Sequence, residues 1–383
     1  MLPLTGVKVI EFCQVAAGPF CGMLLADMGA DVIKVESPQG GDGLRQWPPL
    51  TGGFSENFAS INRNKRSVAL DLKDPEQRDA AKRLALSADV VVENFRPGVL
   101  AKLGLGYDAL AKEKPALVYC SISAFGQTGP RAQEGGFDLT VQAIGGVMSV
   151  TGEPDGPPVK CGVPLADFGA GLYAAYAISC ALHRVRRDGE GDHIDVSMLG
   201  ATLGMAALQT SEYFGTGRDP VKLGSAHPRN APYQAFRAKD GYFAMAAGND
   251  RLWASVCQVV NRNELVKDGR FASTTLRAKN QVELKDILEK SFVEQPVGHW
   301  LKTFAEAGVP CAPINTYSQS LADPQVAHMG WVQPLELPGG AKTRTFVSPL
   351  KMRRQNFGIT RRPPALGEHN TEVLSEIDSA RKP

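Results

Sequence analysis

The first third of the chain alternates short apolar strand patterns with helical patterns, and this alternation limits the possible fold more than any other feature. The run V-K-V-I-E-F (7–12) is followed by helical periodicity over 20–28 and then by D-V-I-K-V-E (31–36). Two strands joined through a helix pair in parallel with a right-handed crossover. V-V-V-E-N-F (90–95) and A-L-V-Y-C-S-I-S (116–123) are continuous apolar runs. Such runs are typical of strands buried in parallel sheets, so the sequence predicts an α/β fold.

The chain is long enough for more than one domain. Its 383 residues exceed the usual size of a single hydrophobic core. Composition shifts near 215–232, and Asp240-Gly241 then separates two alternating runs, which is a hairpin signal. Helical patterns and a short strand follow at 251–260, 276–292, 297–308 and 311–314. We therefore expect a large α/β domain, a smaller α+β domain and a return of the chain to the large domain, at 1–215, 225–325 and 326–383.

Charge and composition set limits on partners and location. The net charge of +2 argues against a nucleic-acid binder that uses a basic face. No apolar run is expected to reach the length of a membrane span, and the opening L-P-L-T-G-V-K-V lacks the basic region of a signal peptide. The seven cysteines are odd in number and form no C-x-x-C pair, which favours reduced thiols. We expect a cytoplasmic protein with neither nucleic acid nor a membrane as a partner.

The sequence also predicts no permanently bound cofactor. Neither the cysteines nor the six histidines have the spacing of zinc ligands, so no metal site is expected. The first strand-to-helix turn, Q-V-A-A-G-P (14–19), lacks the glycines of a dinucleotide-binding turn, although Glu36 ends the second strand as an acid does in those folds. No G-x-x-x-x-G-K-[ST] motif is present, which argues against a P-loop.

Asp167 is the strongest candidate for a chemical role. It stands at the start of a long helical pattern, 163–187, and is followed by Gly169, Ala170 and Gly171. The first turn of a helix favours an ionised carboxylate, and the small residues are expected to leave it open to a bulky substrate. A carboxylate in that position can act as a nucleophile. The alternative is that Asp167 is simply the N-cap of the helix.

Two further segments carry groups suited to phosphates. N-F-R-P-G (94–98) follows a buried strand and supplies an amide, an aromatic ring and a guanidinium at the sheet edge where ligands bind in open α/β folds. The alternative is an ordinary turn set by Pro97 and Gly98. N-R-N-K-R-S (62–67) holds three cations in four residues. It indicates either a solvated face or a phosphate contact.

Taken in order, these motifs resemble the class III CoA-transferase family, which also includes the α-methylacyl-CoA racemases. The resemblance covers nearly the whole chain and implies a large doubly wound, Rossmann-like parallel-sheet domain with a smaller domain. It also implies that the protein forms an interlocked homodimer. The implied substrates are acyl-CoA and a small carboxylic acid. The motifs are L-T-G-V-K-V-I-E-F with A-G-P, L-L-A-D-M-G-A-D-V-I-K-V-E, N-R-N-K-R-S, V-V-E-N-F-R-P-G, G-G-F-D-L, L-A-D-F-G-A-G, K-D-G-Y and L-G-E-H.

The resemblance assigns roles to individual residues. L-A-D-F-G carries the nucleophile of the transferases, which corresponds to Asp167, and implies aspartyl anhydride and aspartyl-CoA thioester intermediates. A phosphate-binding arginine of the family is replaced by Ser37, so Lys34 or Arg63 is expected to take its place. The remaining CoA contacts of the family correspond to Ala16, Ala17, Leu72, Lys73, Asn94, Phe95, Arg96, Lys102 and Phe137.

Two features separate the reactions of the family. The racemases carry a histidine before the aspartate of G-x-D, where this chain has Phe137, and without a second base Asp167 has no partner for moving a proton. The sequence therefore favours a transferase, with a racemase or a non-catalytic CoA-binding protein as alternatives. G-S-A-H-P-R-N-A-P-Y-Q-A-F (224–236) resembles the branch that pairs succinyl-CoA with glutarate-like or itaconate-like acids. In this branch His227 and Arg229 are candidates to bind a distal carboxylate, unless they are surface loop residues, and Gln14 is a third candidate substrate contact.

Overall fold

The computed structural model describes residues 1–355 and 357–379, and the chain divides into two compact units. The first comprises Met1–Val147, Lys160–Arg218 and Pro324–Pro383, and the second comprises Met148–Val159 and Asp219–Asp323. The expected large domain included 148–159, whereas this segment belongs to the second unit. Backbone hydrogen bonding explains the difference, because Gly224 N donates to Gly152 O at 2.9 Å. Lys222 adds bonds from its ammonium to the carbonyls of Gly156 and Pro157.

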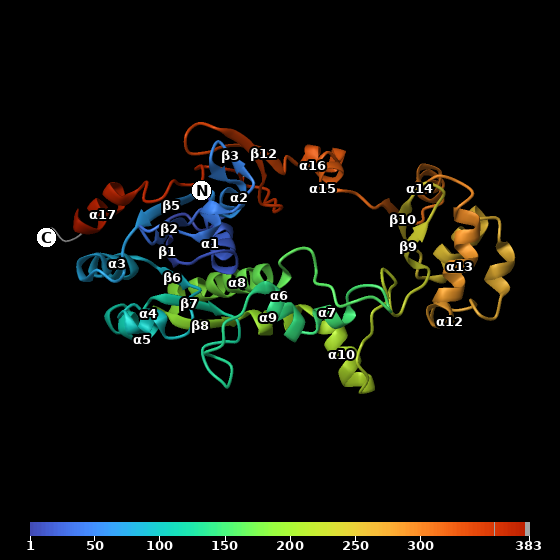
Figure 1. Ribbon diagram of the computed structural model, residues 1–383, viewed down its shortest axis with the longest axis horizontal. Helices are drawn as coiled ribbons and strands as arrows, with labels where there is room; N and C mark the ends of the chain where they lie inside the picture. Colours follow the sequence, from blue (N-terminus) through green and yellow to red (C-terminus); the bar gives the residue numbers. More distant parts are fainter. Residues whose placement is uncertain (356, 380–383) are drawn as a thin grey trace. The chain divides into compact units, whose positions relative to one another are not determined.

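The first unit is built on a parallel six-stranded sheet (Figure 1). Its strand order is β5-β2-β1-β6-β7-β8, and every neighbouring pair is parallel. The chain thus winds outward in one direction from β1 and then in the other from β6, which is the order of a doubly wound fold. The central parallel sheet expected from the apolar runs is confirmed. The strands are β1 Lys8–Phe12, β2 Asp31–Glu36, β5 Lys65–Ala69, β6 Val90–Glu93, β7 Val118–Ser123 and β8 Asp192–Ser197.

Alternate residues of these strands enter two separate cores. Val9 and Val90 pack with the helices α1 and α8 on one face, and Ile10 and Val91 pack with α3, α5 and α17 on the other. Both faces of the sheet are covered, which is why the inner strands β6 and β7 are mainly apolar. The helices of the first unit are α1 Ala17–Asp27, α2 Glu56–Asn62, α3 Pro75–Ser87, α4 Val99–Lys102, α5 Tyr107–Glu113, α6 Asp138–Ile144, α8 Leu165–Asp188, α9 Met198–Met205, α10 Ala207–Thr216, α16 Pro324–Met329 and α17 Asn370–Ser379.

Smaller elements complete the first unit. The segment 38–56 contains a 3-10 turn and a short hairpin, and a second hairpin encloses the L-P-G-G sequence at 337–340. The short helix α7, Val147–Val150, falls at the boundary between the two units. The smaller elements of the first unit are Gly43–Gln46, β3 Leu50–Thr51, β4 Phe54–Ser55, β12 Val332–Glu336 and β13 Lys342–Phe346.

The helix α8 crosses the core of the first unit (Figure 1). Ala166, Ala170, Ala174 and Ile178 are fully buried along one side of it, whereas Tyr176 on the other side is 69% exposed. Among the described residues, it is the helix that is long and apolar enough to cross a membrane by length and composition. The expectation that no apolar run reaches that length was therefore wrong. Its buried side makes α8 the core helix of this unit.

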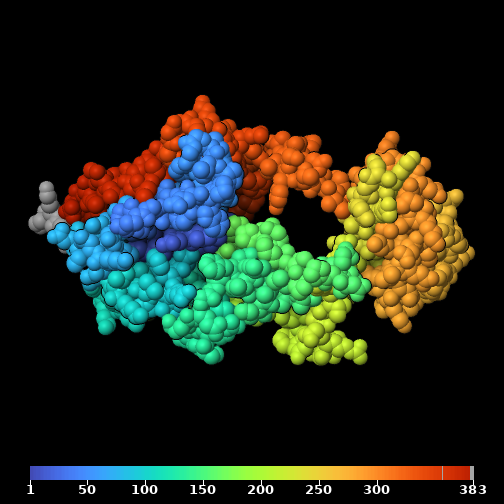
Figure 2. Space-filling model, in the orientation of Figure 1, coloured from blue at the N-terminus to red at the C-terminus, as the bar shows by residue number. Residues whose placement is uncertain are grey.

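The C-terminal segment belongs to the first unit. Figure 2 shows it lying against the N-terminal part of the chain. Asn64 N donates to Arg361 O at 2.9 Å, and the buried Arg66 guanidinium pairs with Asp31 and with Glu376 of α17. These contacts tie β5 to the last helix.

The second unit contains an antiparallel sheet packed on helices. The strand order is β11-β10-β9, and the predicted hairpin around Asp240-Gly241 is confirmed as β9 and β10. Phe236, Phe243 and Trp253 anchor its own fully buried core. The elements are β9 Tyr233–Arg237, β10 Tyr242–Ala246, β11 Cys311–Pro313, α11 Asp250–Val259, the 3-10 turn Asn263–Lys267, α12 Thr274–Lys279, α13 Gln281–Phe292, α14 Val297–Glu306 and α15 Tyr317–Leu321.

Candidate functional site

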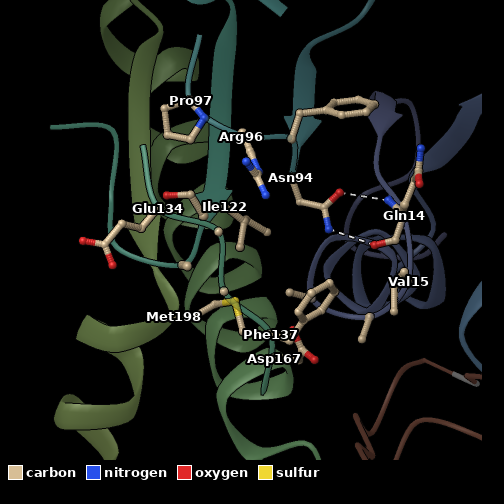
Figure 3. A pocket seen from close by; sticks show the side chains of 17 residues that line it. Gln14, Val15, Asn94, Arg96, Pro97, Ile122, Glu134, Phe137, Asp167 and Met198 are labelled. Carbon is tan, nitrogen blue, oxygen red and sulfur yellow. Dashed lines mark hydrogen bonds between the residues drawn. The ribbon is translucent and has the colours of Figure 1, made fainter. Parts of the chain in front are cut away.

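A cavity of about 380 Å³ opens at the carboxyl edge of the large sheet. It lies where the loops after β1 and β6 diverge, which is the topological switch point of the sheet and the usual ligand position in such folds. In Figure 3, Asp167, Phe137 and Met198 gather at one end of the cavity, while Arg96 and Pro97 lie at the other. The lining residues are Gln14, Val15, Ala16, Ala17, Asn94, Phe95, Arg96, Pro97, Ile122, Ser123, Ala124, Glu134, Gly135, Gly136, Phe137, Asp167 and Met198.

Eight of the candidate residues meet in this cavity. They come from four separate parts of the sequence, namely the first loop, the N-F-R-P-G segment, the G-F-D-L segment and the start of α8. Leu72 and Lys73 follow β5, and the exposed Lys102 ends α4; these three do not line the cavity, and their contact with CoA stays a prediction. The eight are Gln14, Ala16, Ala17, Asn94, Phe95, Arg96, Phe137 and Asp167.

Asn94 fastens the first loop to the loop after β6. Its amide oxygen accepts from Gln14 N at 2.8 Å, and its amide nitrogen donates to Gln14 O at 2.8 Å (Figure 3). Both polar groups of the Asn94 side chain are therefore bonded to the backbone of Gln14, whose own side chain is exposed. Glu93 holds the same turn, because its carboxylate accepts from Phe95 N at 2.9 Å.

Asp167 is the third residue of α8, and Pro164 occupies the N-cap position. The N-cap alternative is therefore wrong. The helix start is held instead by Asp138, whose carboxylate accepts from Ala166 N at 2.9 Å. Burial raises the pKa of Asp167 to about 7, and the neighbouring negative charge of Asp138 adds to the rise. The expectation of a carboxylate kept readily ionised by the helix N-terminus is corrected, because burial and the like charge dominate.

The small residues after Asp167 have a packing role. Gly169, Ala170 and Gly171 are buried. The expectation that they open a route to the Asp167 carboxylate was therefore wrong. A Cβ added at Gly171 would lie 2.8 Å from Ala17 O, and one at Gly169 would meet the side chain of Met205. These positions let α1 and α9 approach α8 closely, and the open side of Asp167 is the cavity itself.

Two polar residues that the sequence analysis did not single out support this site. Asp138 holds the start of α8, and the buried Gln142 donates to Asp138 Oδ2 at 2.7 Å while its own oxygen accepts from Cys161 N at 2.8 Å. Asp138 is the aspartate of the G-F-D-L motif, and this motif could have identified it as a site residue. Glu134 and Ser123 also line the cavity. Ser123 ends β7, so the rule that ligands bind beyond the carboxyl ends of strands points to it.

The basic candidates for a phosphate contact lie elsewhere. Arg63 is 3% exposed and pairs with Asp27 at 2.6 Å, and Lys34 is fully buried. Neither can replace the missing arginine at Ser37, so that expectation was wrong. Lys65 and Arg66 are also buried and ion-paired, and the cluster is neither a solvated face nor a phosphate site.

His227 and Arg229 lie in the second unit. The Nδ1 atom of His227 accepts from the backbone N of Arg229 and of Asn230, each at 3.1 Å. Burial lowers the pKa of His227, and the charge of Arg229 lowers it further. A neutral ring that shapes its own loop favours the surface-loop interpretation for His227.

The chain matches the family model described as "CoA-transferase family III" over residues 4–370. It is 41% identical over 387 residues to a succinate–glutarate CoA-transferase of Agrobacterium fabrum, an alignment that covers 99% of this chain and 97% of that protein. It is 39% identical to a human succinyl-CoA:glutarate CoA-transferase, with 98% of this chain and 86% of that protein covered. A crystal structure of a CaiB/BaiF family protein from Brucella suis superimposes with a TM-score of 0.88 at 40% identity and covers 98% of this chain and 100% of that one.

Proposed function

This chain belongs to CoA-transferase family III, and from that premise we propose that it moves CoA from succinyl-CoA to a free dicarboxylic acid of the glutarate type. Succinyl-CoA and glutarate are named for two relatives that align along nearly the whole chain. The observation that carries the proposal is the position of Asp167, a carboxylate that lines the cavity at the switch point of the sheet.

The reaction proceeds by exchange at the Asp167 carboxylate. One of its oxygens attacks the thioester carbon of succinyl-CoA and the C–S bond breaks, which releases CoA as a thiolate and leaves a mixed anhydride of succinate and Asp167. The thiolate attacks the Asp167 carbonyl, which releases succinate and leaves an aspartyl-CoA thioester. The acceptor carboxylate then attacks the carbonyl carbon of this thioester, the C–S bond breaks, and a second anhydride forms as the CoA thiolate is released. The returning thiolate finally takes the acceptor acyl group and regenerates the Asp167 carboxylate.

The surroundings of Asp167 suit this nucleophile. A carboxylate that is largely removed from water and placed beside Asp138 is high in energy when ionised, as its pKa of about 7 reflects. Acylation removes that charge, so forming the anhydride relieves both the desolvation and the repulsion. A site that excludes water also protects the anhydride and the thioester from hydrolysis.

The walls of the cavity supply contacts for the thioester end of CoA. Phe95 and Phe137 offer aromatic surface, and Arg96 offers a guanidinium for a negatively charged group. Ala16 and Ala17 form the start of α1, whose first-turn N–H groups can stabilise the negative oxygen that develops on the attacked carbonyl.

Exchange of CoA between two acids tests this function. Succinyl-CoA and glutarate are incubated with the enzyme, and glutaryl-CoA is measured by liquid chromatography and mass spectrometry. Asp167→Ala should abolish the product, and Asp188→Ala, which removes an exposed carboxylate at the other end of the same helix, should retain it. An Asp167→Ala enzyme with full exchange activity would refute the proposed role of the residue.

A racemase is the second candidate within the family. Of the described residues that line the cavity, none is a histidine, and Phe137 occupies the position where the racemases carry one. This chain should therefore not wash deuterium from solvent into the α-position of a 2-methylacyl-CoA. Deuterium incorporation without an acceptor acid would favour the racemase, and CoA binding with neither reaction would favour a binding protein.

We also propose that the protein works as an interlocked homodimer in the cytoplasm. Apolar side chains stand exposed along α8 and α10, including Leu172 at 53%, Tyr176 at 69%, Leu208 at 62% and Phe214 at 82%. Large exposed apolar side chains on these two helices support a permanent partner surface. All seven cysteine thiols are free, which supports a reducing compartment. A monomeric mass by light scattering across micromolar concentrations would contradict the homodimer.

A further inference from the structure

The loop that forms one wall of the cavity is held in an unfavourable conformation. Val15 lies between Gln14 and Ala16 on the cavity wall and has φ of +63°. A β-branched residue rarely adopts this left-handed region, and such a strained conformation persists only where the surroundings enforce it. Something in the structure must therefore hold Val15 in place.

Three buried charged side chains bind the backbone of this loop. The Lys34 ammonium donates to Cys13 O at 2.8 Å, the Asp42 carboxylate accepts from Val15 N at 3.0 Å, and the Lys65 ammonium donates to Pro19 O at 2.8 Å. Lys34 and Lys65 are completely buried, and Asp42 is 1% exposed. The loop 13–19, which includes the first residues of α1 (17–19), is thus fastened at its start, at its strained residue and at its end.

The charges are also paired with one another. Lys34 lies 3.0 Å from Asp42 Oδ2, and Glu11 bridges both ammonium groups, at 3.2 Å from Lys34 and 2.9 Å from Lys65. Burial lowers the pKa of Lys34, but the carboxylates of Asp42, Glu11 and Glu36 outweigh burial and hold its pKa above the ordinary value. Both buried cations and both carboxylates therefore have partners, which a buried charge requires.

We propose that Lys34, Asp42 and Lys65 are positioning residues for the proposed transfer reaction, which fix the loop 13–19 in the conformation that receives the reacting thioester. A buried ion pair that served stability alone would not need three bonds to one seven-residue segment, including one to its strained residue. The inference rests on the proposed function for its kinetic readout. Its structural readout is independent of any activity.

Arg63 and Asp27 provide a matched comparison. They form an equally buried ion pair in the same unit, with 3% exposure of each side chain and a separation of 2.6 Å. The Arg63 guanidinium donates hydrogen bonds to Asp27 and to Ser60 O, both outside the loop 13–19. Lys34→Met and Arg63→Met each remove one buried cation, but only the first removes a contact to the loop.

Hydrogen exchange and steady-state kinetics on the full-length enzyme test the proposal. In Lys34→Met, the peptide covering 13–19 should exchange faster than in the wild type, and kcat with succinyl-CoA and glutarate should fall about 10- to 100-fold, as expected for a displaced reaction geometry. KM for succinyl-CoA should change much less than kcat. Arg63→Met should lose stability without either change. Asp42→Asn is the second variant, for use if Lys34→Met does not fold. It preserves the shape of the site and weakens the ion pair, so it should show the same changes in hydrogen exchange and kcat at smaller amplitude.

A glycine at position 15 separates positioning from general stability. Glycine adopts positive φ without strain, so adding Val15→Gly to Lys34→Met should recover kcat about 5-fold or more, while adding it to Arg63→Met should not raise kcat. Unchanged exchange of 13–19 in Lys34→Met and Asp42→Asn, or a fall in kcat no larger than in Arg63→Met, would overturn the inference. If the wild-type enzyme transfers no CoA between succinyl-CoA and glutarate, the proposed function is refuted. The hydrogen-exchange comparison then decides the inference about the loop by itself.

Discussion

Replacing Asp167 with asparagine should stabilise the substrate-free protein while abolishing its activity. The pKa of Asp167 is raised from 3.8 to about 7, a shift of roughly 3 units. Each unit corresponds to 1.36 kcal/mol, which gives about 4 kcal/mol for ionising the carboxylate in the folded state at high pH. The side chain retains some contact with solvent, and screening reduces this to about 2 kcal/mol.

The sign of the effect fixes its pH dependence. A carboxylate with a raised pKa in the folded state contributes its full stability below the unfolded pKa of about 4, and this contribution is lost as pH rises through 7. Asparagine stays neutral throughout. The difference in stability between Asp167→Asn and the wild type should therefore be near zero at pH 4 and should grow to its full size at pH 8.

Thermal unfolding at several pH values measures this difference. Glu134→Gln is the control, because Glu134 lines the same cavity but is exposed and paired with Arg131, which lowers its pKa. That variant should gain no stability between pH 4 and pH 8. If Asp167→Asn is no more stable than the wild type at pH 8, or if its gain does not grow with pH, the carboxylate is not destabilised by its surroundings and our account of its reactivity fails.

Three further variants test other parts of the account. Asp138→Asn removes the like charge beside Asp167 and should shift the rising limb of kcat to lower pH; a pH–rate profile with an unmoved limb would show that Asp138 has no electrostatic effect on the nucleophile. Gly171→Ala places a Cβ 2.8 Å from a carbonyl oxygen of α1 and should cost about 1–3 kcal/mol in urea unfolding, whereas Gly215→Ala, which meets open space in α10, should cost nothing. Phe137→Ala removes an aromatic wall of the cavity and should raise KM for succinyl-CoA about 10-fold with little change in kcat; an unchanged KM would remove this residue from the CoA contacts.

The parallel sheet could be predicted because its strands bury both faces. Runs such as V-V-V-E and V-Y-C-S-I-S are mainly apolar and fully buried, and the helices between them show their own periodicity. The helical pattern of 100–113 continues past Gly104 and Gly106, whereas the structure has two helices, α4 and α5, separated around these glycines. Local glycines interrupt a helix without changing the apolar periodicity that the prediction follows.

The roles of the charged residues could not be predicted from local sequence. Arg63 reads as a surface cation until the fold brings it to Asp27, and Lys65 meets Glu11 from a strand 54 positions away. A charge cluster is usually exposed, and it can be buried only when partners from distant parts of the sequence neutralise its charges. The same holds for Val15, whose backbone conformation depends on Asp42.

Asp167 was identified correctly as a cavity residue, but its electrostatic state was not. Its position at a helix start suggested an easily ionised group, and the like charge of Asp138 lies in another segment that only the tertiary structure brings close. The resemblance of the L-A-D-F-G motif placed the residue, and three-dimensional packing determined its pKa.

Trapping the acylated carboxylate tests the central claim most directly. The enzyme is mixed with succinyl-CoA in the presence of hydroxylamine, digested and analysed by mass spectrometry. The account predicts a hydroxamate on Asp167 that forms only when the donor is present and is missing from Asp167→Asn. Enzyme that exchanges CoA at full rate while Asp167 stays unmodified, or carries the label on another carboxylate, would contradict it.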